Sequence, residues 1–296
     1  MTGSSAVTSE SVTLCRFIAP RQSEPRVGLV QGGVVRDLSS ADVHRLDALL
    51  EDPNLGDRLA RLRAATLSEW PLEDVRLLTP VESQEVWAAG VTYLRSRQAR
   101  IDESDFSARA YEHVYGAVRP EIFFKALPHK VVAAGDAVGI RRDARWSVPE
   151  PELALVINSQ ARVVGFSIGN DMSSRDIEGE NLLYLPQAKI YARSCAIGPW
   201  IVVGPTEQDA RRWRVHLEIR RGGVVVFDGE TRVDQLKRTF AELVGYLFQS
   251  QEFPAGAVLL TGAGIVPDDA FALSAGDVVR ITISGIGTLE NPVVGV

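Results

Sequence analysis

Short stretches of hydrophobic residues, some alternating with polar residues and some continuous, recur along the chain, and both patterns are typical of β-strands. They are residues 86–91, 122–125, 153–157, 163–168, 200–203, 213–220, 224–227, 258–261 and 277–283. Residues 26–38 predict a hairpin around Gln31, Gly32 and Gly33. Many short strands separated by glycine, proline and aspartate predict a β-rich roll or sandwich.

Helical spacing of apolar residues is rarer. It predicts helices over residues 38–50, 55–66 and 234–248, and a charged helix over 93–115. The segment Leu77-Leu-Thr-Pro80 is typical of a linker, so we place a domain boundary near Pro80. The prediction is a small α+β domain over residues 1–80 and a β-rich domain over residues 81–296.

Two glutamates stand directly before an apolar strand in Val148-Pro-Glu-Pro-Glu-Leu-Ala-Leu-Val-Ile157. Side chains alternate along a strand, so Glu150 and Glu152 point the same way, and the flanking prolines favour a sheet edge or mouth. A turn near Gln160 would bring Asp171 back opposite about residue 149. The pattern leaves two interpretations open, an exposed acidic rim or oxygen ligands for Mg²⁺, with Mn²⁺ or Ca²⁺ as alternatives.

Composition narrows the classes of function. The chain has 296 residues, of which 45 % are hydrophobic, and a net charge of −6, which argues against nucleic acid or an anionic membrane as the main partner. No apolar run is long enough for a membrane span, and the first residues lack the pattern of a secretory signal. Two cysteines without a CxxC motif predict free thiols and a cytoplasmic protein. The four histidines are scattered, which makes a histidine-built zinc site improbable.

Two further charged residues stand close to apolar segments. Lys189 lies in Leu185-Pro-Gln-Ala-Lys-Ile-Tyr191, and such a lysine is usually a surface charge, although near a metal it would stabilise an enolate. Glu121 precedes the strand 122–125, and spacing alone favours a loop or helix-end acid. Ser173, Ser174 and Asp176 are predicted to cap a short helix.

Four motifs together resemble the fumarylacetoacetate hydrolase superfamily, from about Val86 to the C-terminus. They are Pro149-Glu-Pro-Glu-Leu-Ala-Leu-Val-Ile157, Gly165-Phe-Ser-Ile-Gly-Asn-Asp-Met-Ser-Ser-Arg-Asp176, Gln187-Ala-Lys189 and Gly285-Ile-Gly-Thr-Leu-Glu-Asn-Pro-Val293. The resemblance implies an α+β, β-rich fold, a mixed β-roll with a small N-terminal α+β domain. It also implies Mg²⁺ ligation by Glu150, Glu152 and Asp171, and a homodimer or homotetramer.

One motif of the superfamily's carbon–carbon hydrolases is missing. Those enzymes typically carry Asn-Tyr-x-x-His-x-x-Glu, whose histidine and glutamate activate water. Here Thr92 stands for the asparagine, Ser96 for the histidine and Ala99 for the glutamate. The segments Pro120-Glu-Ile-Phe-Phe-Lys125, Tyr184-Leu-Pro-Gln-Ala-Lys-Ile-Tyr191 and Thr261-Gly-Ala-Gly-Ile-Val-Pro267 resemble instead the 2-keto-3-deoxy-D-arabinonate dehydratase branch.

That resemblance implies a Mg²⁺-dependent hydro-lyase that removes water from a 2-keto-3-deoxy sugar acid and yields a 2-oxoglutarate semialdehyde. Glu121 is the candidate base for the C3 proton, and Lys189 would stabilise the enolate. The candidate substrate-binding residues are Thr92, Ser96, Lys125 and Thr261. Two alternatives stay open: a hydrolase of an acylpyruvate or 2,4-diketo-3-deoxy sugar acid, and a metal-binding homologue without activity.

Overall fold

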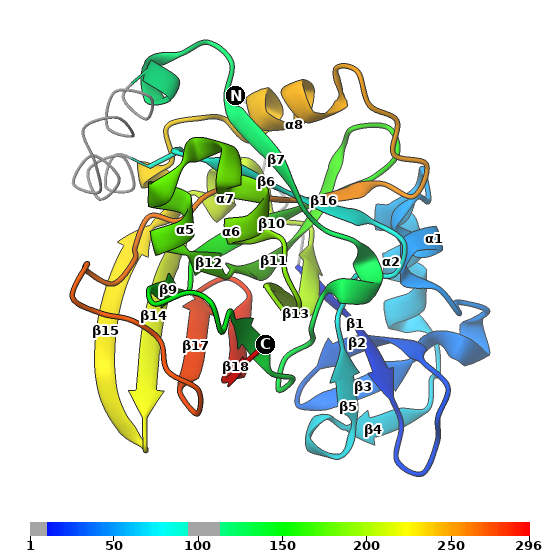
Figure 1. The fold of residues 1–296 in the computed structure, drawn as a ribbon. Helices are drawn as coiled ribbons and strands as arrows, with labels where there is room; N and C mark the ends of the chain where they lie inside the picture. The colour runs from blue at the N-terminus through cyan, green and yellow to red at the C-terminus, as the bar shows by residue number, and fades with distance from the viewer. Residues whose placement is uncertain (1–10, 94–112) are drawn as a thin grey trace, which may run out of the picture.

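The computed structural model describes residues 11–93 and 113–296. Its largest element is one sheet that crosses the molecule (Figure 1). In spatial order its strands are β4 (Glu69–Pro71), β3 (Val34–Asp37), β2 (Arg26–Gln31), β1 (Val12–Ile18), β13 (Cys195–Val203), β11 (Val163–Asp171), β10 (Pro151–Ile157), β16 (Ala257–Leu260), β6 (Glu85–Gly90) and β7 (Glu121–Ala126). β5 (Arg76–Leu78) pairs with β1.

A second sheet of five strands packs against the first. Its order is β15 (Val224–Arg232), β14 (Arg214–Arg221), β17 (Val278–Ile283), β18 (Gly287–Gly295) and β8 (Val138–Ile140). A small two-stranded sheet pairs β12 (Ser173–Ser174) with β9 (Ser147–Val148). The β-rich roll predicted from the many short strands is therefore confirmed.

The helices are short and lie outside the sheets. They are α1 (Leu46–Leu50), α2 (Leu55–Ala64), α5 (Arg175–Glu180), α6 (Leu185–Lys189), α7 (Glu207–Ala210) and α8 (Phe240–Phe248), with 3₁₀ turns η1 (Leu38–Ala41), η2 (Leu72–Asp74), η3 (Pro128–Lys130), η4 (Leu182–Tyr184) and η5 (Val233–Gln235). In the part of the chain that is described, no helix combines the length and hydrophobicity needed to cross a membrane.

Two predicted helices are wrong in part. Residues 38–50 form η1 and α1 instead of one helix, because Asp42 adopts a left-handed conformation (φ +58°) that ends the first turn. The helix predicted over 234–248 begins only at Phe240, where the Thr239 hydroxyl accepts a hydrogen bond from the Glu242 N–H. Most of the helix predicted over 93–115 falls on residues 94–112, outside the described residues.

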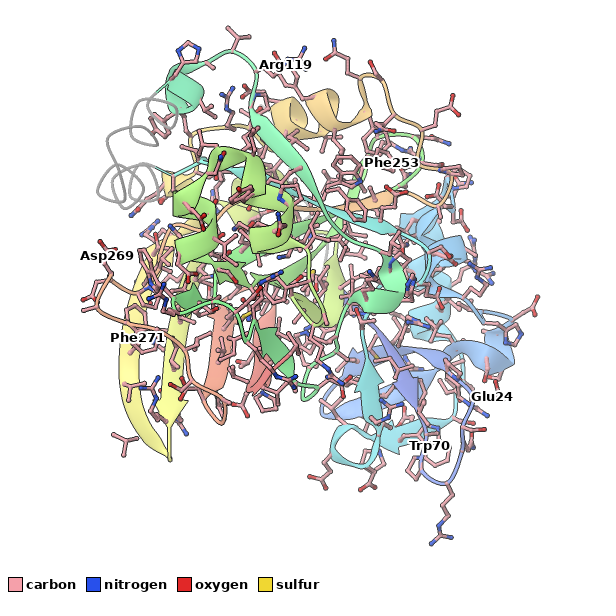
Figure 2. All side chains as sticks on the ribbon, viewed as in Figure 1. Glu24, Trp70, Arg119, Phe253, Asp269 and Phe271 are labelled. Carbon is pink, nitrogen blue, oxygen red and sulfur yellow. The ribbon has the colours of Figure 1, made fainter. Side chains whose placement is uncertain are left out.

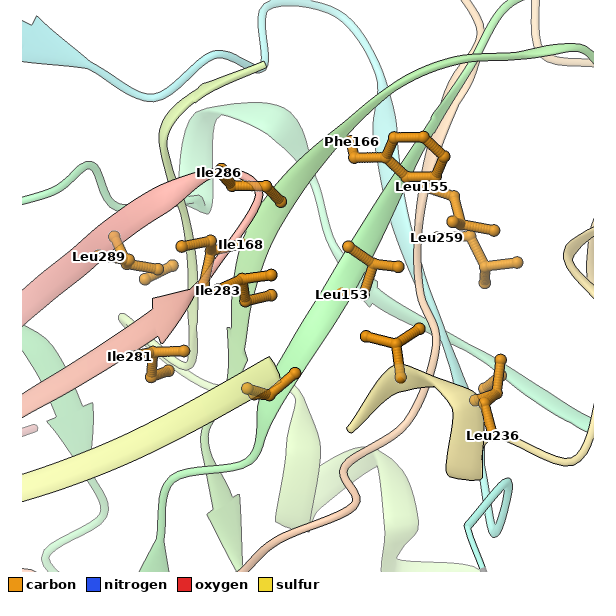
Figure 3. Close-up of a cluster of buried hydrophobic side chains, with 14 of the residues drawn as sticks. Leu153, Leu155, Phe166, Ile168, Leu236, Leu259, Ile281, Ile283, Ile286 and Leu289 are labelled. Carbon is orange, nitrogen blue, oxygen red and sulfur yellow. The ribbon is translucent and has the colours of Figure 1, made fainter. Parts of the chain in front are cut away.

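The main core lies between the two sheets. Ile168 of β11 lies beside Ile283 of β17, as Figure 3 shows. Leu155 of β10 lies beside Phe166 and Leu259 in the same cluster. Phe271, labelled in Figure 2, lies beside β14 and β15, and its ring packs against Phe227 with 6.2 Å between the centroids. This packing fixes β10 and β11, whose far ends carry the acidic residues.

The N-terminal residues add strands to the same large sheet. β1 pairs with β13, with Val12 opposite Val203, and the N-terminal elements (blue in Figure 1) lie at one side of the molecule. Leu14 and Leu29 form a separate apolar cluster with α1 and α2, and this cluster also includes Ile201. The boundary predicted near Pro80 stays a prediction, since strand pairing continues across it.

Candidate metal centre and active site

The three acidic residues lie together at one end of the β10–β11 hairpin. β10 and β11 are antiparallel, with Pro151 opposite Asn170, and the Asp171 N–H donates to the Glu150 carbonyl over 3.0 Å. Asp171 thus stands opposite Glu150 and not residue 149, because an irregularity between Val156 and Ile157 shifts the register by one. The two prolines lie at the start of β10, which is an interior strand of the large sheet. Of the two predicted positions, the sheet edge is therefore wrong, and the prolines lie where the strand opens into the site.

The geometry of this group suits a single ion. One carboxylate oxygen from each of Glu150, Glu152 and Asp171 lies within 4.8 Å of the others. The three side chains are buried, with residue exposures of 4 %, 2 % and 1 %. The interpretation of Glu150 and Glu152 as a solvent-exposed acidic rim is therefore wrong, because tertiary packing covers them.

Basic side chains compensate two of the three carboxylates. Lys189 Nζ lies 2.6 Å from Glu150 Oε2 and 3.1 Å from Asp171 Oδ2. Arg175 Nη2 lies 2.9 Å from Glu150 Oε1, and the Lys125 ammonium contacts Asp171 Oδ1. Buried carboxylates need such partners, because burying an unpaired charge is very costly.

Glu152 has a different environment. Its Oε2 accepts a hydrogen bond from the Gly262 N–H, and no lysine or arginine in the described ranges forms an ion pair with it. Burial, and then the negative charges of Asp171 and Glu150, raise the pKa of the Glu152 carboxyl well above its ordinary range. Three cations thus face three carboxylates, but all of the ion pairs involve Glu150 or Asp171, and Glu152 is left against two negative neighbours.

These observations fit a hard divalent cation. The donors are all carboxylate oxygens, which Mg²⁺, Mn²⁺ and Ca²⁺ prefer over nitrogen or sulfur ligands. An ion among Glu150, Glu152 and Asp171 would offset the repulsion that raises the pKa of Glu152. The three carboxylates therefore fit a bound Mg²⁺, the ion that the sequence predicts.

Strand β7 supplies one wall of the site. Glu121, Phe123 and Lys125 are alternate residues and lie on one face of β7. Phe123 lines the cavity between the carboxylates, and Lys189 Nζ lies 5.7 Å from the centroid of its ring. Glu121 lies across from Gly90 of β6, which also lines the cavity. Glu121 itself is not among the described residues that line the cavity, so its role as the base stays a prediction.

Lys125 shows how strongly the large sheet curls. In the strand order, β7 is four spacings from β11, which would be about 19 Å in a flat sheet. The Lys125 ammonium nevertheless contacts Asp171 and donates to the carbonyls of Met172 and Lys189. It lies behind the carboxylates and does not line the cavity. Its contact with substrate, predicted from the resemblance, stays a prediction.

The two predicted threonines are also buried. The Thr92 hydroxyl donates to the Thr261 carbonyl over 2.6 Å, and the Thr261 hydroxyl donates to the Leu153 carbonyl over 3.0 Å. Neither lines the cavity, so contact with substrate would require these hydroxyls to exchange partners. Ser96 falls outside the described residues.

The cavity itself is small. Its lining includes Val91, Phe123, Ala263 and Val266 around the carboxylates, and its volume is about 10 Å³. A water molecule needs roughly 10–15 Å³ measured in this way, so the space suits one ion or water.

Two residues at this site were missed by the sequence analysis. Arg175 lines the cavity and contacts Glu150, whereas only its neighbours Ser173, Ser174 and Asp176 were singled out, as capping groups. Ser173 does not cap the helix; its hydroxyl lies 2.6 Å from Lys189 Nζ. In the sequence, this segment lies between the strand that ends at Asp171 and Lys189, and that position was the only indication that it could reach the site.

The chain matches a known family over most of its length. The model of the fumarylacetoacetate (FAA) hydrolase C-terminal family covers residues 86–294. The chain is 45 % identical to the "Probable 2-keto-3-deoxyxylonate dehydratase" of Haloferax volcanii over 260 residues, which span 88 % of this chain and 85 % of the relative. It is 41 % identical to the 2-dehydro-3-deoxy-D-arabinonate dehydratase of Saccharolobus solfataricus, over 81 % of this chain and 82 % of the relative.

A solved structure shows the same fold. It is a 2-keto-3-deoxy-D-arabinonate dehydratase complexed with magnesium and 2,5-dioxopentanoate. The match has a TM-score of 0.81 at 33 % identity and covers 96 % of this chain and 99 % of the other. That relative holds both a divalent ion and a 2-keto acid.

Proposed function

The chain belongs to the fumarylacetoacetate hydrolase family, and we propose that it is a magnesium-dependent dehydratase of a 2-keto-3-deoxy sugar acid. The observation that carries this proposal is the buried group of Glu150, Glu152 and Asp171, with Lys189 at the same cavity. Glu121 lies opposite Gly90, which also lines this cavity. The chain combines this group with more than 40 % identity to two dehydratases.

The two relatives point to one kind of substrate. Arabinonate and xylonate differ only in configuration at C2 and C3, and a 2-keto-3-deoxy acid has no stereocentre at either carbon. Both names therefore describe the same skeleton, which varies only at C4. We propose a five-carbon 2-keto-3-deoxy acid as the substrate and 2,5-dioxopentanoate, with one water, as the products.

Glu150, Glu152 and Asp171 would hold the ion. A bound Mg²⁺ supplies a Lewis acid that withdraws electron density from the 2-keto acid and makes its C3 protons more acidic. Lys189 keeps a positive charge beside Glu150 and Asp171, at the wall where negative charge develops on the C2 oxygen. Arg175 adds a second cation to the same wall.

Glu121 is the proposed base. It removes a proton from C3 and returns it to the C4 hydroxyl, which leaves as water. A proton then shifts from C5 to C3 to give an enol, and the enol hydroxyl proton moves to C4 to give the aldehyde. Its position opposite Gly90, on the β7 face that carries Phe123, supports this role. Such a group typically contributes about 10²- to 10⁴-fold to the rate.

Three finer expectations stay predictions. They are a homodimer or homotetramer, a cytoplasmic location, and substrate contacts by Thr92, Ser96, Lys125 and Thr261. The two thiols, Cys15 and Cys195, are free and buried, which agrees with a reducing compartment.

Glu121→Gln tests the proposal. The variant should bind Mg²⁺ in titration calorimetry like the native chain, because Glu121 is not among the three ligands. Its turnover of 2-keto-3-deoxy-D-arabinonate should fall by at least about 10²-fold. Glu24→Gln is the matched control, because Glu24 is exposed in the N-terminal region, away from the site (Figure 2).

The outcomes separate the candidate functions. Normal turnover by the Glu121→Gln variant would reject Glu121 as the base. Native protein that cleaves an acylpyruvate but leaves the deoxy sugar acid unchanged would be a hydrolase instead. Protein that binds Mg²⁺ and converts neither compound would be a metal-binding homologue without activity.

A further inference from the structure

We propose that Gly90 is a positioning residue, whose missing side chain provides the space that the Glu121 carboxylate occupies. This inference rests on the proposed function, since it concerns the base of that reaction. An ideal β-carbon built on Gly90 would lie 1.9 Å from Glu121 Oε2 and 2.7 Å from Glu121 Cδ. Real β-carbons essentially never approach another atom so closely, so any side chain at residue 90 displaces this carboxylate.

Strand register explains the contact. Gly90 and Glu121 are directly opposed in the antiparallel β6–β7 pair, and side chains of opposed residues emerge on the same face. The next pairs are Ala89 with Ile122 and Ala88 with Phe123. At Gly90 the Glu121 side chain folds back over the facing backbone, and Gly90 itself lines the cavity.

Backbone conformation does not explain this glycine. Gly90 is not among the residues with positive φ, unlike Gly262, whose φ is +94°. Alanine is therefore allowed at residue 90, and the strand should form with it. The atoms that a β-carbon would meet are the far end of one flexible side chain. The variant can fold by moving the Glu121 carboxylate, and that movement should remove the base from the substrate.

The test is Gly90→Ala in the full-length chain loaded with Mg²⁺. A catalytic group misplaced by about 1 Å can cost about 10²-fold in rate, so kcat should fall by about this factor with KM little changed. Affinity for Mg²⁺ in calorimetry and the melting temperature should stay near native values. Gly56→Ala is the matched control, because nothing lies within 4 Å of a β-carbon there.

A partial reaction isolates the base. 2-Oxobutyrate has no C4 hydroxyl to lose, so exchange of its C3 protons with D₂O, followed by proton NMR, reports proton removal alone. Gly90→Ala should slow this exchange as much as it slows turnover. A crystal structure of the variant should show the Glu121 carboxylate moved away from the cavity.

A double-mutant cycle separates this inference from the proposed function. If Gly90 acts through Glu121, adding Gly90→Ala to Glu121→Gln should cause no further loss of exchange. Full activity of Gly90→Ala, with Glu121→Gln inactive, would overturn the positioning role and leave the base intact. Equal losses in both backgrounds would also overturn it. An active Glu121→Gln variant would instead reject the proposed base.

Poor folding of Gly90→Ala would still be informative. Glu121→Ala removes the carboxylate that the new β-carbon meets, so the double variant should then recover the melting temperature. Failure to recover would mean that residue 90 needs glycine for another reason, and would overturn the inference.

Discussion

The two ends of the β10–β11 hairpin are built on opposite principles. Toward the turn, Leu155 and Phe166 are fully apolar neighbours in the core between the sheets (Figure 3). At the other end the same two strands carry Glu150, Glu152 and Asp171, equally buried but surrounded by charges. One pair of strands thus holds both the main core and the site.

The difference shows where stability and function reside. Apolar burial contributes roughly 25 cal/mol per Å² and needs no partner of a particular kind. Buried charges cost several kcal/mol each unless their partners are well placed, so a charged end adds little net stability. We therefore expect the apolar end to provide most of the stability of the fold. At the charged end, we expect any substitution that removes one charge and leaves its partner buried to be destabilising.

The largest effect should come from breaking the charge balance. Lys189→Met removes the cation that contacts both Glu150 and Asp171, at nearly unchanged side-chain length. Removing one partner of a buried ion pair costs about 3–5 kcal/mol, so the metal-free variant should unfold at a much lower urea concentration. Turnover should also be lost.

Lys130→Met is the control for this variant, because Lys130 is exposed and should tolerate the change. Added Mg²⁺ should recover part of the lost stability by supplying positive charge. Equal urea midpoints for native protein and Lys189→Met would show that the charged end does not depend on this contact.

Leu155→Ala examines the apolar end. The side chain is fully buried in the core, and such truncations cost about 2–5 kcal/mol. Urea unfolding should show this loss, while Mg²⁺ affinity measured well below the melting temperature should not change. Val225→Ala, at a half-exposed position of β15, should have little effect. A large loss of Mg²⁺ affinity in Leu155→Ala would mean that the two ends are not separable.

Mg²⁺ itself should stabilise the charged end. A ligand that binds only the folded state, at 100 times its Kd, adds about 2.7 kcal/mol, so the melting temperature should rise with Mg²⁺ concentration. Glu152→Gln should abolish this rise, because it removes one of three ligands. The same change should raise the melting temperature of the metal-free protein, since one of three repelling charges is gone. A Mg²⁺-dependent rise that persists in the variant would contradict the assigned site.

The smallest effect should come from an ion pair between the buried Asp277 and the half-exposed Arg221. Asp277 accepts hydrogen bonds from Arg221 and from the Ser274 N–H, and Arg221 is half-exposed. Burial raises the pKa of Asp277, but the Arg221 and Ser274 hydrogen bonds outweigh it, so the pKa is lowered overall. The stabilisation is therefore present above the unfolded-state pKa and is lost as pH falls through the lower folded-state pKa.

Asp277→Asn should then cost about 1 kcal/mol at neutral pH. The difference from native protein should shrink as unfolding is measured at progressively more acidic pH. A difference that grows in acid would reverse the assigned direction.

The local patterns were sufficient for most of the fold. Alternation located β14 and β17, because a strand that buries one face repeats every two residues. Continuous apolar runs located β10 and β16, which are buried on both faces. Alternation also located the β2–β3 hairpin around Gly32 and Gly33. Both patterns missed β1, which connects the N-terminal strands to β13, since strand order depends on contacts far apart in the chain.

The acidic site was partly predictable because its residues are also close together along the chain. Glu150, Glu152 and Asp171 belong to one hairpin, so counting residues around its turn brought them together to within one position. The error arose at an irregularity near Val156, which no pattern marks. The contacts of Lys125 and the space at Gly90 were not predictable, because they depend on how β7 curls toward the hairpin.

The amino-acid sequence alone determined many of the strands and which carboxylates share a hairpin end, because both follow from spacing within a few residues along the chain. Only the tertiary structure decided that those carboxylates are buried, that Lys125 and Lys189 meet Asp171, and that the Glu121 carboxylate lies against Gly90. These contacts join segments separated by many residues. Their formation depends on the curvature of the sheet, which results from the packing of the whole molecule.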